Sequence, residues 1–203
     1  MDMILNYLRE EMKKSLTPSR FQHTLGVSYT AANLAMRYKV DMNDALIAGL
    51  LHDNAKYVTD AELIQVCEKN GLTISAIERK NPYLLHSKVG AVRAKNLYGI
   101  KNEDILNAIT YHTTGRPGMT NLEKLIFVAD YIEPNRRIIP NLELIRNEAY
   151  VDLDKTVYLI LANTLSYLMN TKELNSIDQT TIDSYEYYKE IVGPVDTELE
   201  KNE

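Results

Sequence analysis

The residues best suited to chemistry are the four histidines of the chain and two aspartates that lie in apolar stretches. In chain order they are His23, the doublet His52-Asp53, His86, His112 and Asp130. An unpaired carboxylate in apolar surroundings is costly, and a metal ion removes that cost by binding carboxylate oxygen and imidazole nitrogen together. The series therefore indicates a metal site with nitrogen and oxygen ligands, which suits Fe, Mn, Co, Ni or Zn.

Each of these residues also has a simpler interpretation when it is taken alone. A single histidine beside an apolar helix face is more often a hydrogen-bonded, half-buried residue than a ligand. Asp53 could pair with Lys56, which follows it by three residues. Asp130 could pair with a nearby arginine, Arg136 or Arg137. The metal hypothesis requires the whole set to converge, as side chains from facing helices do in bundles.

The elements that must position these residues are helices, because apolar residues recur every three or four positions along nearly the whole chain. Capping boxes are predicted where Thr59 precedes Glu62 and where Thr120 precedes Glu123. Asn43 is the expected cap of a helix that runs to about residue 55. Nine or so helices are expected, among them helices at about 82–99, 103–113, 142–149, 153–171 and 179–191. The absence of period-two alternation predicts an all-α fold.

No proline-rich or Gly/Ser-rich linker divides the chain, so residues 1–203 are predicted to form one domain. Its metal-binding core is expected at about 17–135 and its C-terminal packing helices at about 141–191. The acidic tail at about 193–203 is expected to fray. Tyrosines clustered at 185–188 are expected to pack within the chain or at a homodimer contact, and Cys67 to be a small buried hydrophobe.

Composition excludes several functional classes. Hydrophobic residues make up 45% and charged residues 25% of the chain, which is typical of a globular protein. The net charge of −5 argues against a nucleic-acid polymer as partner. With Cys67 as the single cysteine, neither an intrachain disulfide nor a thiolate metal cluster can form. No apolar run reaches the ~18 residues of a membrane span, and no signal peptide is evident, so a cytoplasmic location is expected.

Several segments around the proposed ligands resemble the HD-domain superfamily of metal-dependent phosphohydrolases. Those segments are His23-Thr24, Leu50–Lys56, Leu85-His86-Ser87, Ile109–Arg116 and Phe127–Arg136. The doublet is a weak signal alone, whereas the run from Ala129 to Arg136, together with the run from His112 to Arg116, resembles the bacterial YqeK-type branch specifically. The motifs cover residues 17–135, and the C-terminal third carries none of them. Enzymes of this branch contain iron and hydrolyse diadenosine tetraphosphate symmetrically to two ADP.

The resemblance implies a ligand set and a substrate. Its metal ligands would be His23, His52, Asp53 and Asp130. The other two histidines would either complete a second metal site, with Asp53 bridging, or bind the substrate phosphate. The expected cofactor is one or two iron ions, with Mn, Co, Ni or Zn as substitutes. The expected partners are a dinucleoside polyphosphate and its ADP product, with no membrane partner.

Catalysis would then require activated water and neutralised phosphate charge. We expect Asp53, Lys56, His86 and His112 to be the catalytic residues. Spacing places Lys56 one turn after Asp53 and Arg20 one turn before His23, so both could face the site. The residues expected to bind phosphate are Arg20, Lys56, His86, His112, Thr113, Arg116 and Arg136. For each cation the plainer alternative is a solvated surface charge.

Two further possibilities stay open at this point. The chain could be another HD-type phosphohydrolase, such as a nucleotidase or an alarmone hydrolase. It could also be a non-catalytic module that binds a nucleotide, in which case six converging ligands would serve no purpose. Of the 14 tyrosines, Tyr111 and Tyr131 flank proposed ligands and are the two expected near the site.

Overall fold

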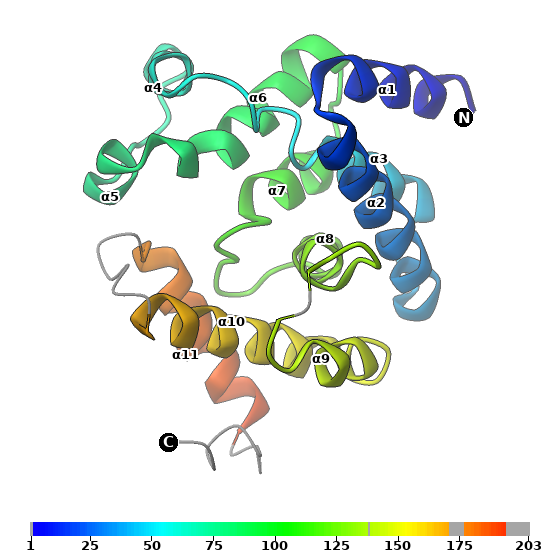
Figure 1. Ribbon diagram of the computed structural model, residues 1–203, viewed down its shortest axis with the longest axis vertical. Helices are drawn as coiled ribbons and strands as arrows, with labels where there is room; N and C mark the ends of the chain where they lie inside the picture. Colours follow the sequence, from blue (N-terminus) through cyan, green and yellow to red (C-terminus); the bar gives the residue numbers. More distant parts are fainter. Residues whose placement is uncertain (1, 138, 171–176, 194–203) are drawn as a thin grey trace.

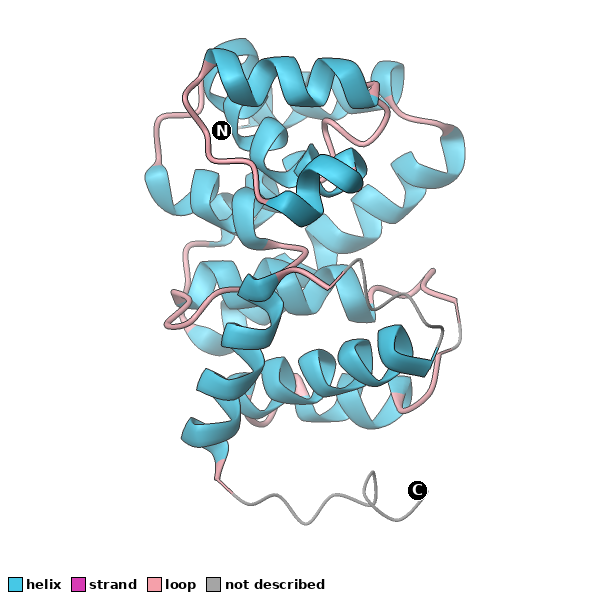
Figure 2. Cartoon of the chain, turned by 90° about the vertical axis from the view of Figure 1, so that its left-hand side faces the viewer, coloured by secondary structure: helices cyan, strands magenta, loops and turns pink. Residues whose placement is uncertain are grey.

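The computed structural model of the chain describes residues 2–137, 139–170 and 177–193. Within these ranges the fold is all-α, as predicted, with helices and connecting loops and no strand (Figure 2). The helices in chain order are α1 (Asp2–Ser15), α2 (Pro18–Tyr38), α3 (Met42–Leu51), α4 (Asp60–Lys69), α5 (Ala76–Lys80), the 3₁₀ helix η1 (Pro82–Leu85), α6 (His86–Tyr98), α7 (Glu103–Tyr111), α8 (Asn121–Ile132), α9 (Leu142–Glu148), α10 (Leu153–Asn170) and α11 (Gln179–Val192). The predicted tail lies outside the described residues from 194 onward.

Side-chain caps explain where several helices begin. Both predicted capping boxes form, at Thr59 before α4 and at Thr120 before α8. A third, which the sequence interpretation missed, starts at Ser75, whose hydroxyl accepts from the backbone N–H of Glu78 at 3.2 Å. This box begins α5, a five-residue helix that was not predicted. Local hydrogen bonds therefore give even this short segment a defined start.

The helix before the His-Asp doublet differs from the prediction at both ends. Its cap is Asp41, whose Oδ1 accepts from the backbone N–H of Asn43 at 2.7 Å, so the expected Asn43 cap is wrong. The helix ends at Leu51 rather than near residue 55. The reason is Asn54, whose side-chain amide donates to the Leu51 carbonyl at 2.7 Å and to the Gly90 carbonyl at 2.9 Å. Tight turns follow, and they turn the chain at the doublet.

The centre of the fold is a group of packed helices, α2, α3, α7 and α8 (Figure 1). Helices α2 and α3 approach closely at Gly49, where an added Cβ would lie 2.6 Å from Ser28 Cα. Helix α6 packs on α7. A smaller apolar cluster lies under α4 and includes Cys67, which is buried as predicted. The close contact at Gly49 brings the end of α3 beside α2, and the site is built there.

The C-terminal helices form a second tier, in which α10 packs against both α8 and α11 (Figure 1). The tyrosines of α11 serve this packing: Tyr188 is buried and its hydroxyl accepts from the Met119 backbone N–H at 3.1 Å. Tyr185 stacks on Tyr158 with ring centroids 5.6 Å apart. None of the described helices is long and apolar enough to cross a membrane.

Candidate metal centre

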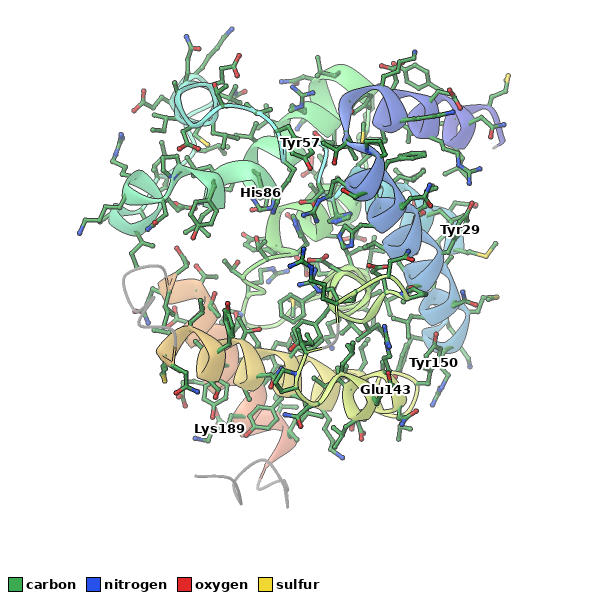
Figure 3. The ribbon with its side chains drawn as sticks, viewed as in Figure 1. Tyr29, Tyr57, His86, Glu143, Tyr150 and Lys189 are labelled. Carbon is green, nitrogen blue, oxygen red and sulfur yellow. The ribbon has the colours of Figure 1, made fainter. Side chains whose placement is uncertain are left out.

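The six predicted ligands come together from different helices. His23 lies on α2, and the doublet follows the last residue of α3. His86 is the first residue of α6, His112 follows the last residue of α7, and Asp130 lies near the end of α8. Figure 3 labels His86, and the helices that carry the other ligands meet beside it in the middle of the molecule. The convergence that the metal hypothesis required is therefore present.

Each histidine has its Nδ1 atom engaged, which fixes the direction of its Nε2 atom. Three of them donate Nδ1–H to the backbone carbonyl three residues earlier, at 2.7 or 2.8 Å. These three are His52, His86 and His112. His23 differs, because its Nδ1 donates to a carboxylate oxygen of Glu133 at 3.1 Å. All four Nε2 lone pairs are therefore free to bind a metal ion.

The Asp53 carboxylate divides the cluster into two halves. Its Oδ2 atom faces one set of ligands, here named the Oδ2 half, which consists of His23, His52 and Asp130. The His52 Nε2 atom lies 3.4 Å from Asp53 Oδ2 and 3.9 Å from Asp130 Oδ1. The His23 Nε2 atom lies 3.0 Å from Asp130 Oδ1 and 4.0 Å from Asp53 Oδ2. Atoms spaced by 3.0–4.0 Å can share one ion with bonds of about 2.1 Å.

The Oδ1 atom of Asp53 faces the other set, the Oδ1 half, which consists of His86 and His112. Their Nε2 atoms lie 3.2 and 3.6 Å from Asp53 Oδ1 and 3.3 Å from each other. Two imidazole lone pairs at that separation repel each other unless a cation lies between or beside them. The Lys56 ammonium is one such cation, with its Nζ 3.2 Å from His86 Nε2 and 3.6 Å from Asp53 Oδ1.

The donor set fits a divalent metal ion. Among the described residues, two groups have ligand atoms close enough to share an ion, namely His23 with His52 and Asp130, and His52 with Asp53 and His112. Three of the cluster's atoms are buried without a hydrogen-bond partner, namely His23 Nε2, His52 Nε2 and Asp53 Oδ1. Buried polar atoms are normally satisfied, so orphaned atoms that point to one place indicate a bound group. The cluster implies a metal ion.

The charges within the cluster perturb its pKa values. Burial would raise the pKa of Asp53, but the imidazoles of His52, His112 and His86 packed against its carboxylate hold that pKa well below its usual value. Burial would likewise raise the pKa of Asp130, but the close His23 imidazole and the charges around it lower that pKa. Both carboxyl groups are thus held ionised, which is the form that binds a metal.

The histidine pKa values shift in opposite directions. Burial lowers the pKa of His86, and this effect outweighs the nearby Asp53 carboxylate. Burial also acts to lower the pKa of His23, but the adjacent carboxylates of Asp130 and Glu133 outweigh it and raise that pKa. The greater number of carboxylates around His23 accounts for the difference.

Three of the predicted phosphate-binding cations lie at the cluster. Arg20 Nη1 is 3.0 Å from Asp53 Oδ2, Lys56 Nζ is 3.6 Å from Asp53 Oδ1, and Arg136 Nη1 is 3.7 Å from Asp130 Oδ1. All three side chains are partly exposed, which leaves them accessible to a ligand. Together they place positive charge at the edge of a site whose predicted ligands are buried, apart from the half-buried Asp130.

The remaining predicted phosphate contacts are placed differently. Arg116 makes a two-pronged ion pair with Glu123, through Nε at 2.9 Å and Nη2 at 2.8 Å, and its guanidinium lies over the Tyr111 ring. The structure thus gives Arg116 another partner and does not bring it into the cluster. Thr113 lies beside His112 and has a buried hydroxyl without a partner. Tyr131 is engaged with the Asn163 amide.

Comparison with known proteins was made once this geometry was established. The family described as "HD domain" matches residues 20–135, which is more than half of the chain. The chain belongs to the HD domain family. The range includes all six of the converging predicted ligands.

Relatives of this HD domain chain match it over most of its length. It is 42% identical over 162 residues to a symmetrical bis(5'-nucleosyl)-tetraphosphatase of Bacillus subtilis, covering 80% of this chain and 86% of that protein. It is 40% identical over 178 residues to the protein of the same name from Staphylococcus aureus, covering 87% and 90%.

A crystal structure from Clostridium acetobutylicum has the same fold, with a TM-score of 0.87 and 36% identity, over 92% of this chain and 97% of that one. That protein is described as a predicted HD superfamily hydrolase involved in NAD metabolism. The likeness extends beyond the HD range and so includes the C-terminal helices, which carry no motif.

Sequence interpretation missed Glu133 as part of the site. Its side chain is buried, and it contacts His23 across 110 residues of chain. One signal was present, because Glu133 follows Asp130 by three residues on an apolar helix, where a buried carboxylate needs a partner.

A second missed contact joins Arg93 and Asn54. Arg93 Nε donates to Asn54 Oδ1 at 3.2 Å and so supports the turn beside the doublet.

Proposed function

We propose that this chain is a metal-dependent hydrolase that cleaves diadenosine tetraphosphate symmetrically into two ADP. The observation that carries the proposal is the convergence of four Nε2 atoms and two carboxylates, with three cationic side chains beside them. A site of this kind suits a small polyanion bound through metal and guanidinium groups. The activity named for the relatives from B. subtilis and S. aureus supports this substrate.

We propose His23, His52, Asp53 and Asp130 as ligands of one metal ion, and His86 and His112 as ligands of a second ion that shares Asp53. The facing Nε2 atoms of the Oδ1 half favour a cation there over direct phosphate contact alone. The ions that suit these donors are Fe, Mn, Co, Ni and Zn, and the resemblance noted above favours iron. When bound, such ions neutralise phosphate charge and lower the pKa of water toward 7.

The chain's own residues then bind and orient the tetraphosphate. Arg20 and Arg136 lie where they can contact phosphate oxygens from the Oδ2 side, and Lys56 from the Oδ1 side. Thr113 has a free hydroxyl to offer. In the reaction, a water oxygen bonds to one of the two central phosphorus atoms while the central P–O bond breaks. One ADP leaves, and the attacked half becomes the second ADP.

A cavity of about 390 Å³ beside the Oδ1 half offers room for one nucleoside of the substrate. It is lined by Ser87 and Tyr111, the chain neighbours of His86 and His112, and by residues of η1, α5 and the start of α11. Several of its polar side chains are already engaged: Thr110 donates to the Leu106 carbonyl, and Asp178 caps α11. A pocket with few free polar groups selects by shape, so we expect it to tolerate different bases.

The deciding experiment is product analysis with diadenosine tetraphosphate. We expect ADP as the only nucleotide product, and no product after metal removal. ATP together with AMP would refute symmetrical cleavage. Preferential hydrolysis of a nucleoside monophosphate or an alarmone, with the tetraphosphate left intact, would instead identify another HD-type phosphohydrolase.

The nucleoside cavity is tested by filling it from its rim. Ala76 lies at the exposed start of α5 and lines the cavity, so Ala76→Trp adds bulk without removing a buried side chain. We expect KM for the tetraphosphate to rise about tenfold or more while metal content is unchanged, since the lost contacts are with the nucleoside. An unchanged KM would show that the nucleoside binds elsewhere.

A further inference from the structure

Glu133 is a buried carboxylate at the C-terminal end of α8, and both of its oxygens are engaged. Its Oε1 accepts from His23 Nδ1 at 3.1 Å, and its Oε2 accepts from the Asn135 backbone N–H at 2.7 Å. The side chain is about 1% exposed, which leaves it almost no contact with water. A buried carboxylate this far from solvent is retained only with strong partners, and His23 is the one that leads to the metal centre.

The other three histidines of the cluster have no such partner. His52, His86 and His112 donate Nδ1–H to a backbone carbonyl within their own turn, so local chain geometry orients them. His23 lies in the second turn of the long helix α2, where the backbone carbonyl three residues earlier is used by the helix itself. The Nδ1–H group of its ring therefore needs an acceptor from outside its own helix. Glu133, at the end of α8, provides that acceptor through its carboxylate.

We propose that Glu133 is a positioning residue that fixes the tautomer and orientation of His23, and that Gly26 is required to admit it. The proposal rests on the proposed metal centre. A carboxylate behind a metal-binding histidine typically changes metal affinity by about 10–100-fold. Glu133 touches neither substrate nor metal, so its effect passes through His23.

Gly26 provides independent evidence for this arrangement. It lies one turn after His23 on α2, facing Glu133. A Cβ added at Gly26 would lie 2.3 Å from Glu133 Oε2, closer than real contacts allow, and 3.1 Å from its Cδ, so the carboxylate would have to move. Glycine lowers helix stability by roughly 0.5–1 kcal/mol relative to alanine, so its use in mid-helix needs a reason. Room for the Glu133 carboxylate is that reason.

The backbone around Glu133 is also held firmly, which a positioning residue requires. Arg146 on α9 donates through Nη2 to the Glu133 carbonyl at 2.9 Å and through Nε to the Ile132 carbonyl at 3.0 Å. The backbone N–H of Arg136 donates to the Glu133 carbonyl at 3.0 Å. The C-terminal end of α8 is therefore fixed by α9 and by the following turn, which holds the backbone that carries the carboxylate in place.

The test compares Glu133→Gln with Glu123→Gln. Both glutamates are about 1% exposed and lie at opposite ends of α8, but Glu123 pairs with Arg116 and does not contact a histidine. A glutamine at 133 keeps its shape but has one acceptor oxygen, so either His23 or the Asn135 N–H loses its partner. The readout is metal affinity, measured by competition with a chelator, with helix content followed by circular dichroism.

We expect Glu133→Gln to weaken metal affinity by about 10–100-fold and Glu123→Gln to leave it within about twofold. Unchanged affinity in Glu133→Gln, or an equal loss in both variants, overturns the proposal. Because metal affinity is measured without substrate, this outcome is separate from the proposed function. A chain that binds metal through His23 but does not cleave diadenosine tetraphosphate would refute the function alone.

A double-mutant cycle keeps the proposal testable if Glu133→Gln folds poorly. Gly26→Ala should weaken metal affinity when Glu133 is present, because the new methyl group displaces the carboxylate. In a Glu133→Ala background the same change should have no further effect, since the space is then free. Independent, additive losses from Gly26→Ala and Glu133→Ala would show that Gly26 acts by another route and would overturn this part of the proposal.

Discussion

The two halves of the cluster share Asp53 but differ in what the protein supplies to each. The Oδ2 half has four protein atoms from two helices, α2 and α8, and the doublet, and Glu133 accepts a hydrogen bond from the far nitrogen of His23. The Oδ1 half has three protein atoms, two histidines oriented by their own backbone, and the Lys56 ammonium within 3.6 Å of Asp53 Oδ1. Sites with fewer protein ligands keep positions open for water or substrate. We infer that the Oδ2 half mainly holds metal, whereas the Oδ1 half mainly meets the substrate.

Asp53→Asn is the change expected to have the largest effect, because Asp53 belongs to both halves. It removes the shared negative charge that His52, His86 and His112 surround. We expect metal to be lost from both halves and kcat/KM for the tetraphosphate to fall by about 1000-fold or more. Metal analysis and steady-state kinetics check this. An Asp53→Asn protein with full metal content and full activity would remove the basis for treating the cluster as one centre.

Asp130→Ala and His112→Ala test the inequality of the halves directly. Asp130 belongs to the Oδ2 half and His112 to the Oδ1 half. Asp130→Ala should release the metal ion of the Oδ2 half and reduce activity by about 100-fold or more. His112→Ala should leave the metal of the Oδ2 half in place, with reduced activity. Metal content after dialysis against a weak chelator distinguishes them, and equal losses would contradict the inferred difference.

The convergence of the six predicted ligands could be expected from the sequence, because imidazoles and carboxylates inside apolar helices are unusual and costly without a partner. Their supporting residues were harder to find. Glu133 contacts His23 across 110 residues, a pairing that depends on how α2 and α8 pack. Local spacing predicted that Lys56, one turn after Asp53, could face the cluster, and in the structure its ammonium lies beside the Asp53 carboxylate.

Arg116 has a partner that its motif does not reveal. Its position after Gly115 predicts a phosphate contact, which stays a prediction, whereas the structure pairs Arg116 with Glu123 after the left-handed turn at Gly115. Glu123 was recognised as part of a capping box, and its second role as an ion-pair partner depends on that turn. The end of the helix before the doublet was misplaced for a similar reason. The Asn54 side-chain amide donates to the carbonyls of both Leu51 and Gly90. Gly90 lies on α6 and is distant in sequence, so local spacing could not reveal this contact.

Lys56→Ala tests the role of the Oδ1 half in substrate binding. A charge-assisted hydrogen bond contributes about 1.5–3 kcal/mol, so its loss should raise KM for the tetraphosphate by roughly 10–100-fold. Metal content should stay at the wild-type level, because removing a cation beside His86 does not remove a ligand. Lys95→Ala is the matched control, since Lys95 is exposed and pairs only with Glu103 among the described residues. Metal loss with unchanged KM would contradict a phosphate role for Lys56.

Arg136→Ala should have the smallest effect of the site changes. Its Nη1 lies 3.7 Å from Asp130 Oδ1, and its side chain is 36% exposed, whereas Arg20 Nη1 lies 3.0 Å from Asp53 Oδ2 with a side chain 29% exposed. Exposed ion pairs contribute about 0–1 kcal/mol, so losing Arg136 should raise KM by less than about fivefold. Arg20→Ala should raise it more, because Arg20 contacts the carboxylate that both halves share. The reverse order would place the main guanidinium contact with phosphate beside Asp130 rather than beside the shared Asp53.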